Sequence, residues 1–368
     1  MRFATAWALA KVLLVAAVDV RPLRRRRGQR SASSVIPMVQ INDDPYVRHS
    51  LLTSTFFSKT RLLVLGNPKA AGTTLRWWLL AAHGVDVRAR TAKSLWGESA
   101  PFQTVWDPAI DLEFTWACLS LQQQQDALTS ADVLTVHPVR HPLSRLFSAW
   151  SSKYLVGEPY YSERLPDGFP TVPDTVEDEN HVAELFEKFV NAIHDTVSEG
   201  DFLALDVHFW PQARLLARPM EGDELVVRQE HMAEGLAAIA SYLAERDLEA
   251  GEAPRINETV VPYRDELVSD RTKDMAIALY GEDFERWQYP RDLPPSSSRP
   301  VDIEWLNDVR GRNRRYGVLH REVLRAHDEN AHLRAEEERL SRRERELLNS
   351  TSWKVTRPLR WVSNNAKR

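Results

Sequence analysis

Residues 66–74 place a lysine, two glycines and two threonines in a short stretch that can bind an anion. The lysine is Lys69, and the stretch ends in Gly72, Thr73 and Thr74, directly before a helix-favouring run. Backbone N–H groups at a helix N-terminus, an ammonium group and hydroxyls are the donors that a phosphate or sulfate group requires. We therefore expect an anion-binding loop made of Pro68, Lys69, Ala70, Ala71, Gly72, Thr73 and Thr74.

The position of the lysine separates this loop from the common ATP-binding loop. In the Walker A pattern, a lysine and a Ser or Thr directly follow the last glycine. Here Thr73 follows Gly72, and Lys69 stands three residues before that glycine. A loop for ATP hydrolysis is therefore disfavoured, and a tight turn without a ligand stays open as the alternative.

A second set of polar residues begins at Arg140, directly after the apolar run 133–139. Ligands of open α/β sheets bind at the carboxyl ends of strands. A planar guanidinium can donate two hydrogen bonds to one phosphate. Ser144 and Ser148 lie one helical turn apart on the helix that follows. The alternative is an arginine at a sheet edge with two surface serines.

Together, the two motifs resemble those of the sulfotransferases that use 3′-phosphoadenosine-5′-phosphosulfate (PAPS). In that family the first loop holds the 5′-phosphosulfate, and an arginine followed eight residues later by a serine holds the 3′-phosphate. Arg140 and Ser148 have this spacing. The first loop looks like that of the Golgi carbohydrate sulfotransferases, and the resemblance runs in order over roughly residues 60–290. Its further segments are Asp206-Val-His-Phe-Trp-Pro-Gln212, Asn257-Glu-Thr, Tyr263, Leu279-Tyr280, Asp283-Phe284 and Tyr289.

The resemblance implies transfer of the sulfuryl group of PAPS to a hydroxyl of a carbohydrate or glycoconjugate, with no metal. Lys69 would stabilise the charge on the leaving phosphate. Heparan-type relatives carry a histidine before the phosphate-binding arginine, but the corresponding region here, 114–120, has none. His208 is therefore the first candidate for the general base, with a substrate contact or a structural role as alternatives. Glu113 and Asp111 are the next candidates.

Other histidines and aromatic residues are interpreted from their places in the pattern. His137 alternates within an apolar strand and is expected to pack in the core, and His83 is expected to cap a helix end. The chain has 12 tryptophans, and aromatic faces stack on sugar rings as well as on core side chains. The candidates for an acceptor cleft are Trp150, Tyr160, Tyr161, Phe209 and Trp210.

The elements that must position these residues alternate between strands and helices. Apolar runs at 62–65, 133–139 and 225–228 predict strands, and helices are predicted at 74–83 and 142–154. This order indicates an α/β domain with a central parallel sheet, and the resemblance implies the three-layer fold of P-loop NTPases. Further helices are predicted over 119–128, 182–197, 232–245 and 271–280.

Composition divides the chain into three parts. Residues 1–55 form a basic and apolar segment with a linker, residues 56–300 the sulfotransferase domain, and residues 301–368 a helical tail with a basic aromatic C-terminus. A seven-residue repeat favours a coiled-coil-like tail and a homodimer, with a solvated single helix as the alternative. The repeat consists of Leu319, Ala326, Leu333, Leu340 and Leu347.

Length, composition and charge limit which partners and which cellular compartment are expected. The chain has 368 residues, a net charge of −4 and 43% hydrophobic residues, which is typical of a globular protein and gives no sign of nucleic-acid binding. Its single cysteine, Cys118, excludes an intrachain disulfide. The Golgi relatives carry disulfides, so a bacterial cytoplasmic enzyme is expected instead. Basic and aromatic residues at 352–362 suit peripheral contact with the inner membrane face.

Two further functions stay open. A nucleotide-dependent phosphotransferase on the same fold would require ATP and magnesium. A non-catalytic scaffold with a retained nucleotide site would bind nucleotide without turnover.

Overall fold

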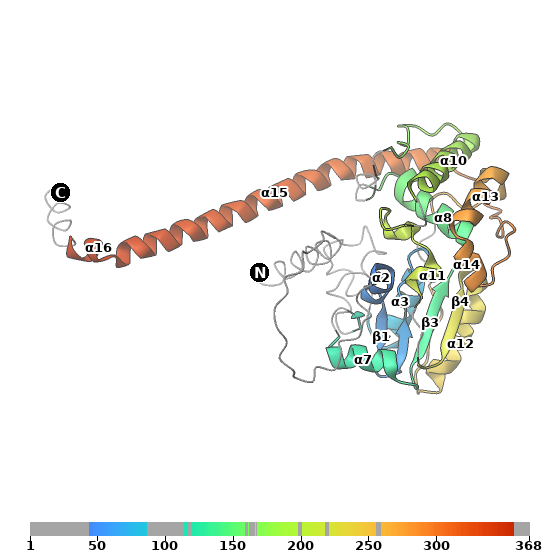
Figure 1. Cartoon of the computed structure of the whole chain (residues 1–368), viewed down its shortest axis with the longest axis horizontal. Helices are drawn as coiled ribbons and strands as arrows, with labels where there is room; N and C mark the ends of the chain where they lie inside the picture. Colours follow the sequence, from blue (N-terminus) through green and yellow to red (C-terminus); the bar gives the residue numbers. More distant parts are fainter. Residues whose placement is uncertain are drawn as a thin grey trace, which may run out of the picture.

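The computed structural model describes a mixed α/β domain from which one long helix extends (Figure 1). The described residues are 44–86, 114–116, 119–158, 161, 166, 168–197, 201–217, 221–254 and 259–356. Its helices of four or more residues are α2 (Pro45–Leu52), α3 (Gly72–Ala82), α7 (Leu121–Thr129), α8 (Pro142–Trp150), the π-helical turn η3 (Ser151–Leu155), α10 (Glu179–Thr196), α11 (Gln212–Leu215), α12 (Met232–Ala244), α13 (Asp270–Leu279), α14 (Gly281–Arg286), α15 (Ile303–Asn349) and α16 (Thr351–Val355).

The sheet has the strand order β1-β2-β3-β4. The three predicted strands are confirmed as β2 (Leu62–Val64), β3 (Leu134–Val139) and β4 (Glu224–Arg228), and they are parallel. The predicted central parallel sheet is extended at one edge by β1 (Thr55–Phe57), which was not predicted and pairs antiparallel with β2. A three-residue edge strand is too short to give a recognisable alternation in the sequence.

Helices cover both faces of the sheet, so the domain has three layers. Leu62 and Val64 of β2 share a core cluster with buried residues of α3 and α12. Leu63 points to the opposite face and joins a larger cluster with residues of α2, α7, α8 and α10. The period-two alternation of one strand thus builds both cores.

The described domain begins before residue 56, where the linker was expected to end. Asp44 caps α2 by accepting hydrogen bonds from the backbone N–H groups of Tyr46 (2.8 Å) and Val47 (3.3 Å). Proline at the first helical position is compatible with this start. Ser50 of α2 donates a hydrogen bond to the carbonyl of Gly66, so α2 packs against the anion-binding loop.

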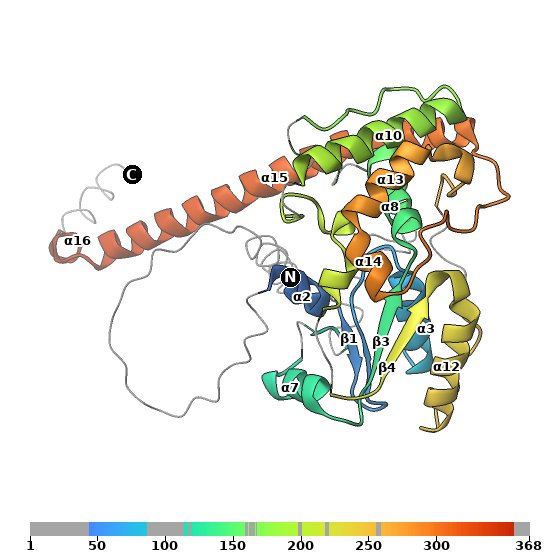
Figure 2. The same cartoon turned by 45° about the vertical axis from the view of Figure 1, so that its right-hand side comes forward.

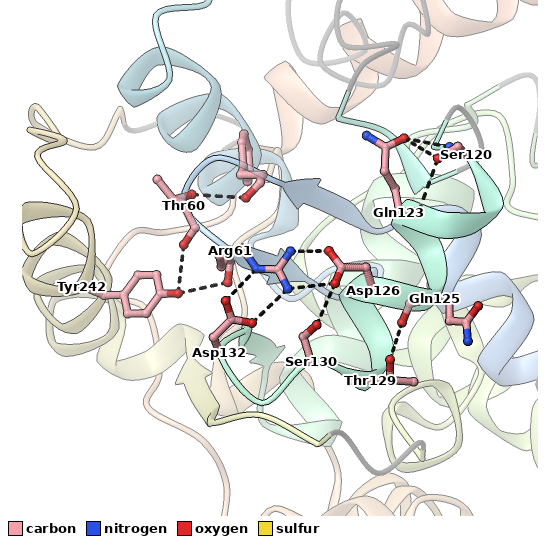
Figure 3. A network of polar contacts seen from close by, with 11 residues as sticks. Thr60, Arg61, Ser120, Gln123, Gln125, Asp126, Thr129, Ser130, Asp132 and Tyr242 are labelled. Carbon is pink, nitrogen blue, oxygen red and sulfur yellow. Dashed lines mark hydrogen bonds and ion pairs between the residues drawn. The ribbon is translucent and has the colours of Figure 1, made fainter.

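The amino ends of the strands are closed by a polar network (Figure 3). Arg61, directly before β2, pairs with Asp126 of α7 and with Asp132, at 2.9 Å from Nη2 to Asp132 Oδ1. The hydroxyl of Tyr242 donates to the carbonyls of Thr60 (2.9 Å) and Arg61 (3.0 Å). The loops that follow β2 and β3 therefore lie at the opposite edge of the sheet.

In the described part of the tail, the 47-residue helix α15 is followed by the short helix α16. Asp302 caps the start of α15 by accepting from the backbone N–H of Trp305 at 2.8 Å. The first turns pack on the domain through buried Leu306, and the helix then projects away from it (Figure 2). The predicted helix is confirmed, and Leu333 and Leu340 of the repeat are exposed on it. None of the described helices is both long and apolar enough to span a bilayer.

Candidate active site

The loop between β2 and α3 holds Lys69 in a rare backbone conformation. Lys69 has φ of 67° and Ala71 has φ of 59°, both in the left-handed region that non-glycine residues seldom adopt. Ala71 is the N-cap of α3, and its methyl group cannot accept hydrogen bonds from the first-turn N–H groups. Thr73 and Thr74 lie in that first turn. This helix start therefore offers N–H groups and hydroxyls to an anion.

Gly66, at the start of the loop, is enclosed by α2 and by Thr53 and Ser54, which follow α2. Its N–H donates to Ser54 Oγ at 3.0 Å, and its carbonyl accepts from Ser50 Oγ at 2.8 Å. A Cβ atom at this position would lie 1.9 Å from Thr53 Oγ1. Only glycine permits this close approach between the loop and its support.

Lys69 points into the domain and meets the helix after β3. Its Nζ donates to Ser152 Oγ at 2.7 Å, and Ser152 Oγ donates to the carbonyl of Ser148 at 2.7 Å. Burial, with the charges of Lys153 and Arg140 nearby, lowers the pKa of Lys69 to about 7. An amine held among other cations is stabilised in its charged form by an anionic ligand.

Arg140 lies at the carboxyl end of β3, as predicted, and reaches the loop after β2. Its Nε donates to Ser144 Oγ at 3.0 Å, and its Nη1 contacts the carbonyl oxygen of Lys69 at 3.4 Å. Burial lowers the pKa of Arg140 to about 10. Ser148 is buried one turn further along α8. The structure thus brings together Lys69 and Arg140, which were predicted separately.

Arg145 is a buried cation whose role the sequence did not reveal. Its Nε donates to the carbonyl of Pro68 at 2.9 Å, and its Nη1 donates to the carbonyl of Trp210 at 2.8 Å. Burial lowers its pKa. Arg145 therefore joins the anion-binding loop to the segment that carries His208. In the sequence, only its position directly after Ser144 in the second motif could have pointed to this role.

Gln212 fixes the backbone of Arg140 and was also missed as a site residue. Its Oε1 accepts from the backbone N–H of Arg140 (3.2 Å) and from Asn67 Nδ2 (3.1 Å), and its Nε2 donates to the carbonyl of Arg140 (2.6 Å). Asp283 in turn accepts from the backbone N–H groups of Gln212 (3.1 Å) and Ala213 (2.6 Å). Burial raises the pKa of Asp283 to about 7. The segment around Asp283, which belongs to the family resemblance, therefore holds Gln212 in place and through it the backbone of Arg140.

His208 forms a pair with Asp206 in the same site. Its Nδ1 lies 2.6 Å from Asp206 Oδ1, and its backbone N–H donates to the same oxygen at 3.0 Å. Burial lowers the pKa of His208, an effect opposed by Asp206 and reinforced by the charges of Lys153 and Lys69. With the Nδ1 proton directed to Asp206, Nε2 is the basic nitrogen of a neutral imidazole.

Tyr161 and Lys153 lie beside this histidine. The rings of Tyr161 and His208 meet edge-on, with centroids 5.1 Å apart. Lys153 Nζ lies 4.1 Å from the centroid of the Tyr161 ring and 2.8 Å from Glu158 Oε2. An aromatic ring and a cation therefore adjoin the candidate base.

The aromatic residues predicted for the acceptor cleft divide into two groups. Trp150, Phe209 and Trp210 are buried in the larger core, which corrects the prediction for these three. Trp150 ends α8, and Phe209 and Trp210 lie in the segment before α11. All three side chains point into the core, where their apolar surface is used for packing. Tyr161 lies at the site, and Tyr160 is outside the described residues.

His137 and His83 have the structural roles predicted for them, and the two candidate carboxylates lie elsewhere. His137 is fully buried in β3 and His83 caps α3, with Nδ1 at 2.7 Å from the carbonyl of Leu79, which confirms both predictions. Glu113 and Asp111 lie outside the described residues. In the described part of the chain, no group of three or more His, Cys, Asp or Glu side chains could hold a metal ion.

The donor set suits a ligand with two separate anionic groups. One set comprises Lys69 and the start of α3, and the other comprises Arg140 with the serines of α8. Both sets lie at the carboxyl ends of neighbouring parallel strands, where ligands of open α/β sheets bind.

Comparison with known proteins agrees with this arrangement. The family model for sulfotransferases matches residues 58–290, which is more than half of the chain and includes every site residue discussed above. No curated protein and no solved structure matches the chain. The sulfotransferase resemblance seen in the sequence is therefore confirmed at the level of the family, and the chain belongs to the sulfotransferase family.

Proposed function

We propose that the protein transfers the sulfuryl group of PAPS to a hydroxyl of a carbohydrate or glycoconjugate, as a bacterial member of the carbohydrate branch. Sulfotransferases generally use PAPS as the donor. The observation that carries the proposal is the contact between the two predicted half-sites, in which Arg140 Nη1 approaches the carbonyl of Lys69 at 3.4 Å. One ligand with a phosphate at each end would bind both.

The two half-sites would divide the recognition of the donor. Arg140, with Ser144 and Ser148 on the helix that follows, would hold the 3′-phosphate through a charged fork and hydroxyl groups. Lys69, the loop N–H groups and the two threonines of α3 would hold the 5′-phosphosulfate.

His208 is the proposed general base. Its Nε2 takes the proton of the acceptor hydroxyl as the acceptor oxygen forms a bond to sulfur. The bond from sulfur to the bridging oxygen breaks, and 3′,5′-ADP leaves. Lys69 stabilises the negative charge that develops on that oxygen, and Asp206 stabilises the imidazolium that forms.

The surroundings of His208 support a sugar acceptor. Tyr161 offers an aromatic ring, and Lys153 offers a cation beside it. Sugar rings present C–H groups to aromatic faces and hydroxyl oxygens to cations. These side chains adjoin the candidate base, where the acceptor hydroxyl has to lie.

Titration calorimetry with 3′,5′-ADP and with 5′-AMP tests donor recognition. We expect 3′,5′-ADP to bind at least about tenfold more tightly, because only it reaches Arg140. Arg140→Ala should abolish this preference, and Arg140→Lys should keep part of it, because lysine retains the charge without the fork. Exposed Arg271→Ala on α13 serves as the matched control and should bind as the wild type does.

Turnover of labelled PAPS with polysaccharide fractions then separates the remaining alternatives. Sulfated product supports the proposal. Preference for ATP and magnesium would identify a phosphotransferase instead. Tight 3′,5′-ADP binding without product from any hydroxyl acceptor would identify a scaffold.

We also propose a homodimer formed through the tail and a cytoplasmic location at the inner membrane face. The exposed leucines of α15 recur at seven-residue spacing and are flanked by both signs of charge, so a second copy offers a matching face. The location rests on the single cysteine and on the basic aromatic composition of 352–362.

A further inference from the structure

The first turns of α15 cap the π-helical turn η3, which follows α8. The last carbonyls of a helix have no partner within it and need one from elsewhere. Arg310 Nη1 donates to the carbonyl of Leu155, the last residue of η3. Asn313 Nδ2 donates to the carbonyl of the next residue, Val156, at 2.8 Å. Two side chains of the tail helix therefore complete the end of η3.

Arg310 is committed to this role by burial. Its side chain is almost fully buried, and Nη2 also donates to the carbonyl of Pro173. Burial lowers the pKa of Arg310 to about 10. A buried guanidinium is costly unless its donors are satisfied, and here Nη1 and Nη2 each bond a backbone carbonyl while Nε has no partner, so the two bonds tie α15 to both segments.

A third side chain of α15 bonds the segment that contains Pro173 and Val176. Asn307 Nδ2 donates to the carbonyl of Val176 at 2.8 Å, and its Oδ1 accepts from the N–H of Val176 at 2.9 Å. Leu306 is fully buried next to it. Residues 306, 307, 310 and 313 therefore form one face of α15 that is docked on the domain.

The turn that α15 caps carries two residues of the site. Ser152 accepts the hydrogen bond of Lys69 Nζ, and Lys153 lies over the ring of Tyr161 next to His208. The extra residue of a π-helical turn changes the direction of every side chain after it, and such turns are frequent at functional sites. The direction of Ser152 and Lys153 thus depends on η3 keeping its form.

We propose that Arg310 and Asn313 are positioning residues for sulfuryl transfer, which act by holding η3 so that Ser152 meets Lys69 and Lys153 faces the acceptor. This inference rests on the proposed function. The family match ends at residue 290, and α15 begins at Ile303. The chain therefore completes its active site with a helix outside the matched region.

Asn313→Asp tests the proposal with little change in shape. The substitution replaces the amide donor by an acceptor that faces the carbonyl of Val156. We expect kcat to fall about tenfold because Lys69 and Lys153 lose their alignment. The Kd for 3′,5′-ADP should rise by much less than kcat falls, because Arg140 and Ser148, which precede η3, keep their contacts with the 3′-phosphate and only the contact of Lys69 with the 5′-phosphate is weakened. Amides of residues 151–158 should exchange hydrogen faster than in the wild type.

Two further variants calibrate the result. Arg310→Lys keeps a cation but cannot donate to two carbonyls in fixed directions, so its kcat should also fall while 3′,5′-ADP binding is retained. Arg312→Ala removes an exposed side chain from the same helix and should change none of the three measurements.

Three outcomes overturn the inference. Wild-type kcat in Asn313→Asp would show that the contact does not position the site. A parallel fall of kcat, 3′,5′-ADP affinity and melting temperature would show a general structural role. A wild-type chain that neither binds 3′,5′-ADP nor forms sulfated product would contradict the proposed function as well. This third outcome is distinguishable, because in the first two outcomes the wild type is active.

Discussion

Lys69 combines a strained backbone with an unusually acidic ammonium group. Its left-handed φ is costly for a residue with a side chain, and its pKa is lowered to about 7. Both features are what we expect of the proposed anion site. A bound anion would supply the negative charge that the surrounding residues Arg140, Arg145 and Lys153 do not.

Donor binding is expected to take up a proton at Lys69. In the free protein, Lys69 loses its proton as the pH rises through about 7, and a bound phosphate moves this pKa back toward its ordinary, higher value. Binding of 3′,5′-ADP at about pH 8 should therefore absorb up to one proton, and its affinity should weaken as the pH rises further.

Calorimetry in two buffers with different ionisation enthalpies measures this uptake. Lys69→Arg keeps its charge throughout the range and should show no comparable uptake. Equal uptake by the wild type and Lys69→Arg would assign the proton to another group.

The sequence identified the residues whose role depends on local spacing. Lys69, Arg140 and Ser148 follow predicted strands at short distances, so their meeting at one sheet edge could be anticipated. Gln212 and Ser152 could not be anticipated, because their partners lie far away in the sequence and only the folded chain brings them together.

At the scale of elements, the sequence predicted those strands and helices whose apolar residues recur at a regular spacing and form one buried face. The run 142–154 has the pattern of one helix, and nothing in it marks the change from α8 to η3 after Trp150. The carbonyls at the end of η3 accept hydrogen bonds from α15, which lies more than a hundred residues later in the sequence. α2 was missed for a related reason, since its burial depends on the loop at Gly66.

Gly66→Ala tests the support of the anion-binding loop by α2. The new methyl would clash with Thr53 Oγ1 and with the carbonyl oxygen of Ser50, 2.6 Å away, so α2 or the loop has to move. We expect a loss of about 1–3 kcal/mol in the free energy of unfolding, together with weaker 3′,5′-ADP binding. Denaturant unfolding and calorimetry measure the two effects.

Gly251→Ala is the matched control for this substitution. No atom lies within 4 Å of a Cβ built at Gly251, so the change should be nearly neutral. Similar destabilisation in both variants would contradict the role assigned to α2.

At the scale of the whole molecule, α15 has two different halves. Its start is docked through Arg310 and Asn313, whereas Leu333, Leu340 and Leu347 are exposed further along. Exposed leucines at this spacing predict self-association of the outer half, although the charged residues Glu337 and Glu344 lie within the same face.

Sedimentation equilibrium tests the dimer. The wild type should have twice the chain mass of 42.2 kDa, and Leu340→Asp should shift it toward the monomer by placing a charge in the seam. Leu121→Asp on α7 replaces an even more exposed leucine outside the tail and should leave the mass unchanged. A wild type that is monomeric at micromolar concentration would rule out the proposed homodimer.

The docked start of α15 also sets a distance. Each helical residue adds about 1.5 Å, so the 47 residues of α15 span about 70 Å from Ile303 to Asn349. An intact helix of this length keeps any surface that binds its far end at a fixed distance from the candidate site. If the proposed acceptor is attached to that same surface, the length of α15 would set how far from the attachment point the acceptor hydroxyl lies.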